Sequence, residues 1–172
     1  AAALVAGVAS SAPALAQTAP GLIGLTRNLP LVLNVNTGTC LAQRCIPALP
    51  SASTLPPWAG GTAYDSVRGG TWSTNGNVIA EVGQGTCATF CPAQPVPISP
   101  NAVATGLAYN ESTKTLFISD SLNFISTVQV TGCNLTVTST CQTWPVTATN
   151  PTIGGLATDD VNGLIFYSGS SW

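Results

Sequence analysis

Charged side chains are scarce in this chain. Its 172 residues include four Lys and Arg and six Asp and Glu, so 6% of the chain is charged, against roughly 25% in an average soluble protein. A nucleic-acid-binding protein needs clustered basic side chains to neutralise phosphates. The basic residues here are scattered singly, at Arg27, Arg44, Arg68 and Lys114. We therefore expect no nucleic-acid partner.

Histidine is absent altogether. Without it the chain cannot assemble a Ser-His-Asp or Cys-His nucleophilic system, or a histidine-ligated metal site. The numerous Ser and Thr hydroxyls therefore have no histidine base to activate them. Six acidic residues are present, but their spacing does not select two of them as the carboxylate pair of a glycoside hydrolase. We expect no enzymatic activity and no cofactor.

What the chain has instead is turn-forming and strand-forming residues. It contains 17 Gly and 13 Pro, together with many Val, Ile and Thr. Gly and Pro favour turns, and β-branched residues favour strands. The composition therefore predicts an all-β fold of strands joined by frequent turns.

The N-terminal segment, residues 1–16, is apolar and rich in small residues. It closes with Ala14-Leu15-Ala16 before Gln17, the small-residue pattern that signal peptidase cleaves. We interpret it as a signal-peptide remnant, the alternative being a buried or pilin-like helix, which Pro13 would interrupt. No stretch after residue 17 has transmembrane length. The sequence thus predicts a secreted or cell-surface protein with no integral membrane segment.

A repeat with a period near 46 residues follows. The segment GTAYDSVRGGTWSTNG, from Gly61, matches GLAYNESTKTLFISDS, from Gly106, and GLATDDVNGLIFYSGS, from Gly155, at offsets of 45 and 49 residues. Each copy reads as a short strand, a polar turn and an aromatic-bearing strand. Two further apolar or extended stretches follow each copy where the chain is long enough. The repeat unit is therefore predicted to be four strands.

Cysteines recur in the same frame. They form three close pairs, Cys40 with Cys45, Cys87 with Cys91, and Cys133 with Cys141, whose first members lie 47 and 46 residues apart. In an exported protein, close pairs favour local disulfides over metal ligation. We expect each pair to form a disulfide that closes the loop between the third and fourth strands.

Four antiparallel strands in 45–50 residues are typical of a β-propeller blade. The segments from Gly106 and Gly155 resemble the first two strands of blades in the NHL and YWTD propeller families. In those families a Gly-Leu-Ala strand crosses a turn into an aromatic strand that ends near Ser-Asp-Ser. Asp120 stands at such an end, and Phe166-Tyr167 stand where the YWTD aromatics would be. The resemblance covers roughly residues 22–172 and implies a propeller fold.

The repeats predict the following organisation of residues 17–172. A partial blade at 22–59 precedes whole blades at 61–105 and 106–154, and a second partial blade occupies 155–172. A closed propeller needs about four to eight blades, and six at this period would need on the order of 280 residues. We therefore expect either that the natural chain is longer or that its partial end blades pair with strands of a partner.

Several side chains could carry a binding or catalytic role. The first group, Asp65, Asp159 and Asp160, falls in turns after first strands, where carboxylates shape the loop by accepting backbone N–H bonds. The second group, Asp120, Glu81 and Glu111, leaves open a calcium or lactonase-type site, although Asp120 aligns with Asn75 and Gly169, so the acid does not recur. Trp72 is predicted to pack in the core.

Two tryptophans lie near predicted blade edges, Trp58 after two prolines and Trp144 before Pro145. Such side chains could stack on sugar rings, with packing against a neighbouring blade as the alternative. Two glycosylation sequons occur, at Asn110 and Asn134.

These observations lead to three functional hypotheses. The first is an exported, non-catalytic propeller module that binds a protein or carbohydrate ligand or serves as surface structure. The second is a self-assembling extracellular fibre or oligomer whose half-blades are completed between copies. The third is a calcium-dependent, lactonase-like propeller hydrolase.

Overall fold

The computed structural model describes residues 21–26, 29–34, 40–43, 61–83, 88–143 and 153–169, the first three ranges by their backbone alone. Every regular element in these ranges is a strand. The strands are β1 (Gly21–Thr26), β2 (Leu29–Asn34), β3 (Cys40–Gln43), β4 (Gly61–Asp65), β5 (Gly70–Thr74), β6 (Val78–Gly83), β7 (Thr89–Pro95), β8 (Ala104–Asn110), β9 (Thr115–Asp120), β10 (Phe124–Thr131), β11 (Asn134–Gln142), β12 (Ile153–Asp159) and β13 (Leu164–Gly169).

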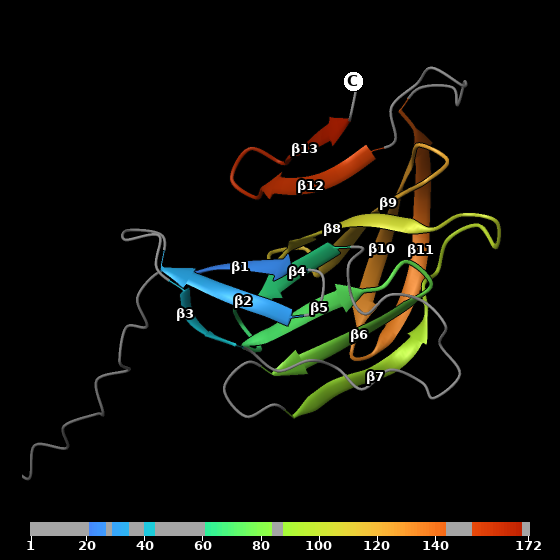
Figure 1. Ribbon diagram of the computed structural model, residues 1–172. Coiled ribbons are helices and arrows are strands. Elements are labelled where there is room, and N and C mark those ends of the chain that lie inside the picture. Colours follow the sequence, from blue (N-terminus) through green and yellow to red (C-terminus); the bar gives the residue numbers. More distant parts are fainter. Residues whose placement is uncertain are drawn as a thin grey trace, which may run out of the picture.

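The strands form four antiparallel sheets in which sequence neighbours are spatial neighbours (Figure 1). Two sheets have four strands, β4-β5-β6-β7 and β8-β9-β10-β11, while β1-β2-β3 and β12-β13 form a three-stranded and a two-stranded sheet. The predicted fold class is confirmed, because the described residues form two whole four-stranded blades with a partial blade on either side. These four sheets do not close into a ring.

The first turn of each repeat is built by one side chain. Asp65 Oδ1 accepts the N–H groups of Val67 and Arg68, each at 3.1 Å. Asp159 Oδ1 accepts the corresponding pair in β12–β13, and Asn110 Oδ1 accepts the Thr113 N–H at 2.9 Å. Such side-chain bonds replace the strand ladder where the chain reverses. The polar residue that ends each first strand is therefore a structural part of the repeat, as was predicted for Asp65 and Asp159.

The same turns each contain one residue of positive φ, four positions after the Asp or Asn. These residues are Gly69 (66°), Lys114 (56°) and Gly163 (67°). Glycine adopts this region without strain, whereas Lys114 adopts it at a modest cost. The turn geometry is thus common to all three copies although one lacks the glycine.

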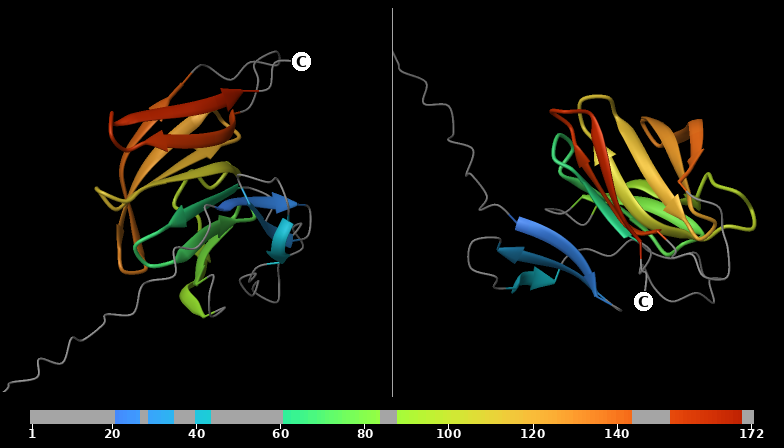
Figure 2. Two further views of the ribbon diagram at one scale, coloured as in Figure 1. Left: turned by 90° about the vertical axis from the view of Figure 1, so that its left-hand side faces the viewer. Right: turned by 90° about the horizontal axis from the view of Figure 1, so that it is seen from above.

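A glycine at or near the start of each first strand has a different role. A Cβ on Gly61 would lie 2.9 Å from the Gly106 Cα, and a Cβ on Gly106 would lie 3.3 Å from the Gly155 Cα. The first strand β8 contacts both β4 and β12, and the three glycines lie in sequence where the backbones of successive first strands approach closely. This close approach explains why the repeat opens with Gly. Figure 2 shows the two whole sheets and the β12–β13 hairpin side by side around these strands.

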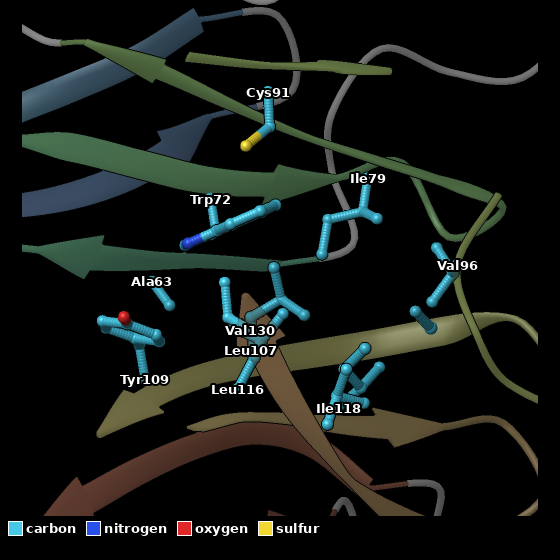
Figure 3. Close-up of a cluster of buried hydrophobic side chains, with 12 residues drawn as sticks. Ala63, Trp72, Ile79, Cys91, Val96, Leu107, Tyr109, Leu116, Ile118 and Val130 are labelled. Atoms are coloured by element: carbon cyan, nitrogen blue, oxygen red, sulfur yellow. The ribbon is translucent and has the colours of Figure 1, made fainter. Parts of the chain in front are cut away.

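The core lies between the two four-stranded sheets (Figure 3). Trp72 in β5 is fully buried, which confirms the prediction that it packs in the core. The buried side chains that pack together come from both sheets and include Ala63, Ile79, Leu107, Leu116, Ile118, Val128 and Val130. Burial of each large apolar side chain contributes roughly 1.5–3 kcal/mol. The buried cluster is therefore formed by contact between the two sheets.

Candidate functional site

A groove of about 510 Å³ opens on one face of the β8–β11 sheet. One wall is the connection from β7 to β8, and the other comes from β10, β11 and the turn before β10. The lining residues are Pro97, Ile98, Ser99, Asp120, Leu122, Phe124, Ser126, Val137 and Thr140. Apolar side chains with a few hydroxyls are the usual lining of a ligand pocket. The groove is therefore the candidate binding site.

The hydroxyls in the groove are held in a fixed arrangement. Ser126 and Thr140 are cross-strand partners in β10 and β11, and their hydroxyl oxygens lie 3.3 Å apart. Ser126 is buried, whereas Thr140 is exposed at the groove rim. A ligand in the groove would meet an aromatic ring at Phe124 beside a pair of hydroxyls.

Asp120 supplies a carboxylate to the groove lining. It is 2% exposed, and its Oδ1 accepts the N–H groups of Leu122 at 2.8 Å and Phe124 at 3.1 Å. Asn75 in the preceding blade accepts the N–H groups of Asn77 and Val78 in the same way. The predicted alignment of Asp120 with Asn75 therefore reflects a shared turn. In both blades this position shapes the turn between second and third strands.

A second polar cluster lies between the two whole blades. Glu81 in β6 is fully buried, and its Oε2 lies 2.7 Å from Nη1 of Arg68. Arg68 also donates to the Gly132 carbonyl at 3.3 Å and stacks over the Phe90 ring at 5.4 Å from its centroid. Gly132 belongs to the β10–β11 turn of the next blade, so the guanidinium joins both blades.

Burial changes the acid strength of Glu81. The pKa of this carboxyl is raised to about 7, first by burial and then by the charge of Asp65, with Arg68 opposing the shift. The Glu81 Oε1 atom is buried and has no hydrogen-bond partner. Gly70 leaves room for it, because a Cβ there would collide with the carboxylate. Glu81 is thus half satisfied, and burial of a carboxyl oxygen without a partner disfavours the ionised form.

Tyr109 and Asp65 complete this cluster. Trp72 and Cys91 of one sheet and Tyr109 of the other point into the space between the sheets (Figure 3). The pKa of the Tyr109 phenol is raised, first by burial and then by the neighbouring Asp65 carboxylate. The phenol therefore stays protonated. The cluster combines two carboxyls with the Arg68 guanidinium in a largely buried space.

The remaining turn carboxylates link one blade to the next. The Ser66 N–H donates to Glu111 Oε1 at 2.7 Å, and the Glu111 N–H donates to Asp160 Oδ2 at 3.1 Å. These three residues occupy the same position in successive first turns. Asp159 is half-buried, and hydrogen bonds from Asn162 lower its pKa. Glu111 and Asp160 thus hold neighbouring turns together.

The predicted local disulfides are wrong for two of the three pairs. Cys91 bonds to Cys133, across the two blades, with their Cα atoms 5.2 Å apart, and Cys141 is a free, exposed thiol. Cys133 precedes the nine-residue strand β11 and Cys141 lies near its far end. At about 3.3 Å per residue the two are roughly 25 Å apart along the strand, far beyond the reach of a disulfide. Cys87, the predicted partner of Cys91, lies outside the described residues.

Other predicted sites also fall beyond the described part of the chain. These are Trp58, Trp144, Cys45 and the side chain of Cys40.

The two sequon asparagines are described, and they differ in burial. Asn110 is 8% exposed and its Oδ1 accepts three hydrogen bonds, whereas Asn134 is exposed at the start of β11.

Within 61–83, 88–143 and 153–169, no three side chains of Cys, Asp or Glu gather closely enough to hold a metal ion. No helix among the described residues is long and apolar enough to cross a membrane.

The groove and the Arg68–Glu81 pair were not predicted from the sequence. The signal for the pair is weak: a single Glu within the apolar stretch VIAEV, and a single Arg in the preceding turn. A charge at a core position is rarely left unpaired, so a Glu in this stretch indicates a nearby cation. The groove has no comparable signal, because its walls come from separate segments.

Comparison with solved structures places this arrangement among β-propellers. A chain of the nidogen/laminin complex superposes with a TM-score of 0.57 at 18% identity, over 87% of this chain and 52% of that one. A chain of the mitotic checkpoint complex superposes with a TM-score of 0.54 at 11% identity, over 83% of this chain and 40% of that one. The structure of U3-55K superposes with a TM-score of 0.50 at 13% identity, over 80% of this chain and 38% of that one. The chain is therefore an incomplete β-propeller that spans about half or less of these similar chains.

At the level of sequence the chain stands apart. No protein-family profile matches it, and no curated protein is significantly similar in sequence. Similarity to known proteins therefore identifies the fold alone.

Proposed function

We propose that this chain is an exported β-propeller module that binds a partner through the groove on the β8–β11 sheet and carries out no chemistry of its own. The groove is the observation that carries the proposal. It combines apolar walls at Ile98, Leu122 and Phe124 with the hydroxyls of Ser126 and Thr140. These groups suit an amphipathic ligand, such as a protein segment or a carbohydrate, which offers both apolar surface and hydroxyl or amide partners.

The positions of the carboxylates support a non-catalytic role. Asp120 uses Oδ1 to hold the turn beside the groove. Asp65 and Asp159 hold first turns, and Glu81 pairs with Arg68 inside the interblade space. General acid–base catalysis needs a carboxyl free to exchange a proton with a bound substrate. These four carboxyls instead serve the fold.

The disulfide supports export. Cys91–Cys133 joins residues separated by 42 positions, and such bonds persist mainly in oxidising compartments. This observation agrees with the signal-peptide remnant inferred from residues 1–16.

The groove can be tested with a matched pair of variants. Thr140 and Ser139 are adjacent exposed residues of β11, and side chains of adjacent strand residues point to opposite faces. Thr140→Trp would fill the groove, whereas Ser139→Trp would add the same side chain on the other face. A peptide library and an oligosaccharide array are screened with the wild type.

We expect ligands selected by the wild type to lose at least about tenfold in affinity for Thr140→Trp and to bind Ser139→Trp as before. Equal binding to both variants would refute the groove as the site. Turnover of a selected ligand, detected by mass spectrometry, would refute the non-catalytic role.

Self-assembly is a second candidate, favoured by the surface of β13. Leu164 is 51% exposed and Phe166 is 57% exposed, in a strand with none of its residues buried. An uncovered strand of this kind is a template for pairing with another chain. Sedimentation velocity over a hundredfold range of concentration tests this candidate. A defined oligomer that Phe166→Asp dissociates would support it, and a monomer throughout would refute it.

A further inference from the structure

The interface between the two whole blades shows how successive repeats are joined. The β10–β11 hairpin completes its own sheet by pairing with β9. Its turn also reaches the preceding blade, where Cys133 bonds to Cys91 and the Cys133 carbonyl accepts a hydrogen bond from Gln94 at 2.8 Å. One hairpin therefore forms two contacts, a strand edge and a disulfide.

A hairpin of this kind needs a strand edge with which to pair and a cysteine with which to bond. Both are found again one blade further along the chain. The first is the strand β13, which pairs with β12 and with no other strand of the described residues. β13 matches β9 at an offset of 49 residues, yet β9 has five of six residues buried and β13 has none. The edge of β9 is paired with β10, whereas no described strand pairs with the corresponding edge of β13.

The second surface is the thiol of Cys141. In β7, Cys91 stands opposite Glu81 of β6. The equivalent of Glu81 in the next blade is Thr127, 46 residues later, and it stands opposite Ser139 of β11. Cys141 lies two residues beyond Ser139, so the two side chains share one face of the strand.

This face is the one directed away from the groove. The groove is lined from β10 and β11 by Phe124, Ser126 and Thr140, which alternate with Ile125 and Cys141. Cys91 bonds forward, to the blade that follows its own. Cys141 occupies the corresponding face of its blade and is exposed. The blade that follows is the one that β12 and β13 begin.

We propose that the β13 edge and Cys141 together form a docking site for a β-hairpin with a cysteine at its turn, namely the third and fourth strands of a further copy of this repeat. The hairpin pairs with β13, and its turn cysteine forms a disulfide with Cys141. Two thiols then lose two protons and two electrons, which a low-molecular-weight disulfide such as oxidised glutathione accepts. The inference goes beyond ligand binding in the groove and does not depend on it.

The test uses a hairpin that the chain itself supplies. A synthetic peptide of residues 124–142, with Cys141→Ser so that Cys133 is its only thiol, is added to the whole protein in a glutathione redox buffer. The matched control is a peptide of the same composition in scrambled order with one cysteine. Mass spectrometry after digestion identifies the cysteine that each peptide joins.

We expect the hairpin peptide to bond to Cys141 at least about tenfold faster than the scrambled peptide, because docking raises the local thiol concentration. Phe166→Asp should remove most of this preference, since Asp is a poor strand residue, whereas Val161→Asp in the exposed β12–β13 turn should keep it. Equal rates for the two peptides would overturn the proposal, as would a preference that survives Phe166→Asp.

A second measurement does not require the disulfide to form. With Cys141→Ser protein and excess hairpin peptide, amide hydrogen exchange in β13 should slow at least about threefold while exchange in β5 stays constant. No change in β13 at millimolar peptide would overturn the docking surface. These two measurements are independent of the groove. If the groove variants failed to affect ligand binding, the results for peptide bonding to Cys141 and for amide exchange in β13 would still test this proposal.

Discussion

Glu81 is a buried acid with one guanidinium partner and one unpartnered oxygen. Arg68 from the first turn, Asp65 at the end of β4, Tyr109 from β8 and the Cys91–Cys133 disulfide surround it. Its pKa is raised in the folded state to about 7, from an ordinary value of 4.5. A carboxyl with a raised pKa stabilises the folded state at pH values where it is protonated, and this contribution is lost as the pH rises.

We therefore predict that the free energy of unfolding falls between about pH 4.5 and pH 7 through this one group, by up to roughly 3 kcal/mol. Glu81→Gln, which cannot ionise, should flatten the pH dependence in this window. Urea denaturation at pH 5, 6 and 7.5 measures how the free energy of unfolding changes with pH in the wild type and in the variant. Parallel slopes for the wild type and the variant would contradict the assignment to Glu81.

Two glycines of positive φ differ in their surroundings. At Gly61, with φ 144°, an added Cβ would lie 2.9 Å from the Gly106 backbone, whereas at Gly69, with φ 66°, it would meet nothing within 4 Å. Gly69→Ala should cost about 1 kcal/mol from backbone strain alone. Gly61→Ala should cost at least about 2 kcal/mol more, because the close approach of β4 to β8 cannot relax cheaply. Thermal unfolding of both variants measures the difference, and equal losses would count against the close approach as the cause.

At this scale the sequence predicted turn residues well and buried contacts poorly. Asp65 and Asp159 were expected in turns because their role is local, involving N–H groups two and three residues away. The Arg68–Glu81 pair depends on the register of three strands and on Gly70 leaving space. No local pattern contains that register, so the pair and its pKa could not be predicted from the sequence.

Among the elements, the interblade disulfide has the largest expected effect on stability. It closes a loop across 42 positions, which the chain-entropy relation values at about 4 kcal/mol. We predict a loss of that order for Cys91→Ser with Cys133→Ser, measured by urea denaturation under oxidising conditions. Cys141→Ser is the matched control, since this thiol is free and exposed, and it should leave stability within about 0.5 kcal/mol of the wild type.

The cysteine prediction was right about chemistry and wrong about partners. Close spacing along the chain suggested local loops, but an extended strand carries residues apart at about 3.3 Å each. Cys133 and Cys141 are thereby separated by most of the length of β11, while Cys133 is brought against Cys91 by the stacking of two sheets. Repeat spacing predicts which strands form but not which blade a side chain faces.

The two sequons are separated by burial. Attachment of a glycan needs an accessible side-chain amide, which Asn134 offers at the beginning of β11 and Asn110 does not. Expression in a glycosylating eukaryotic host should yield a glycan at Asn134 alone. Asn134→Gln should remove the added mass, and Asn110→Gln should leave it in place, as judged by intact-mass spectrometry. A glycan at Asn110 would mean that the sequon is modified before its turn folds.

Among the strands whose side chains are described, burial is greatest in β5 and β9, whereas β11 and β13 have no buried residue. The four-stranded sheets bury their strands against each other, so that β5 and β9 are almost completely covered. The fold could be predicted from the sequence because the repeat fixes strand number and length. The difference in burial between these strands could not be predicted, since it depends on which sheets have neighbours on both faces.

This difference in burial predicts the order in which backbone amides exchange with solvent. Amides in β5 and β9 should exchange only through large-scale unfolding, because their strands are paired on both edges and buried. Amides in β13 should exchange at least about a hundredfold faster, since local opening of β13 exposes little apolar surface. Hydrogen-exchange mass spectrometry at low protein concentration measures the contrast. Protection of β13 equal to that of β9 would mean that another strand covers it in solution, and raising the protein concentration would then show whether a second copy supplies that strand.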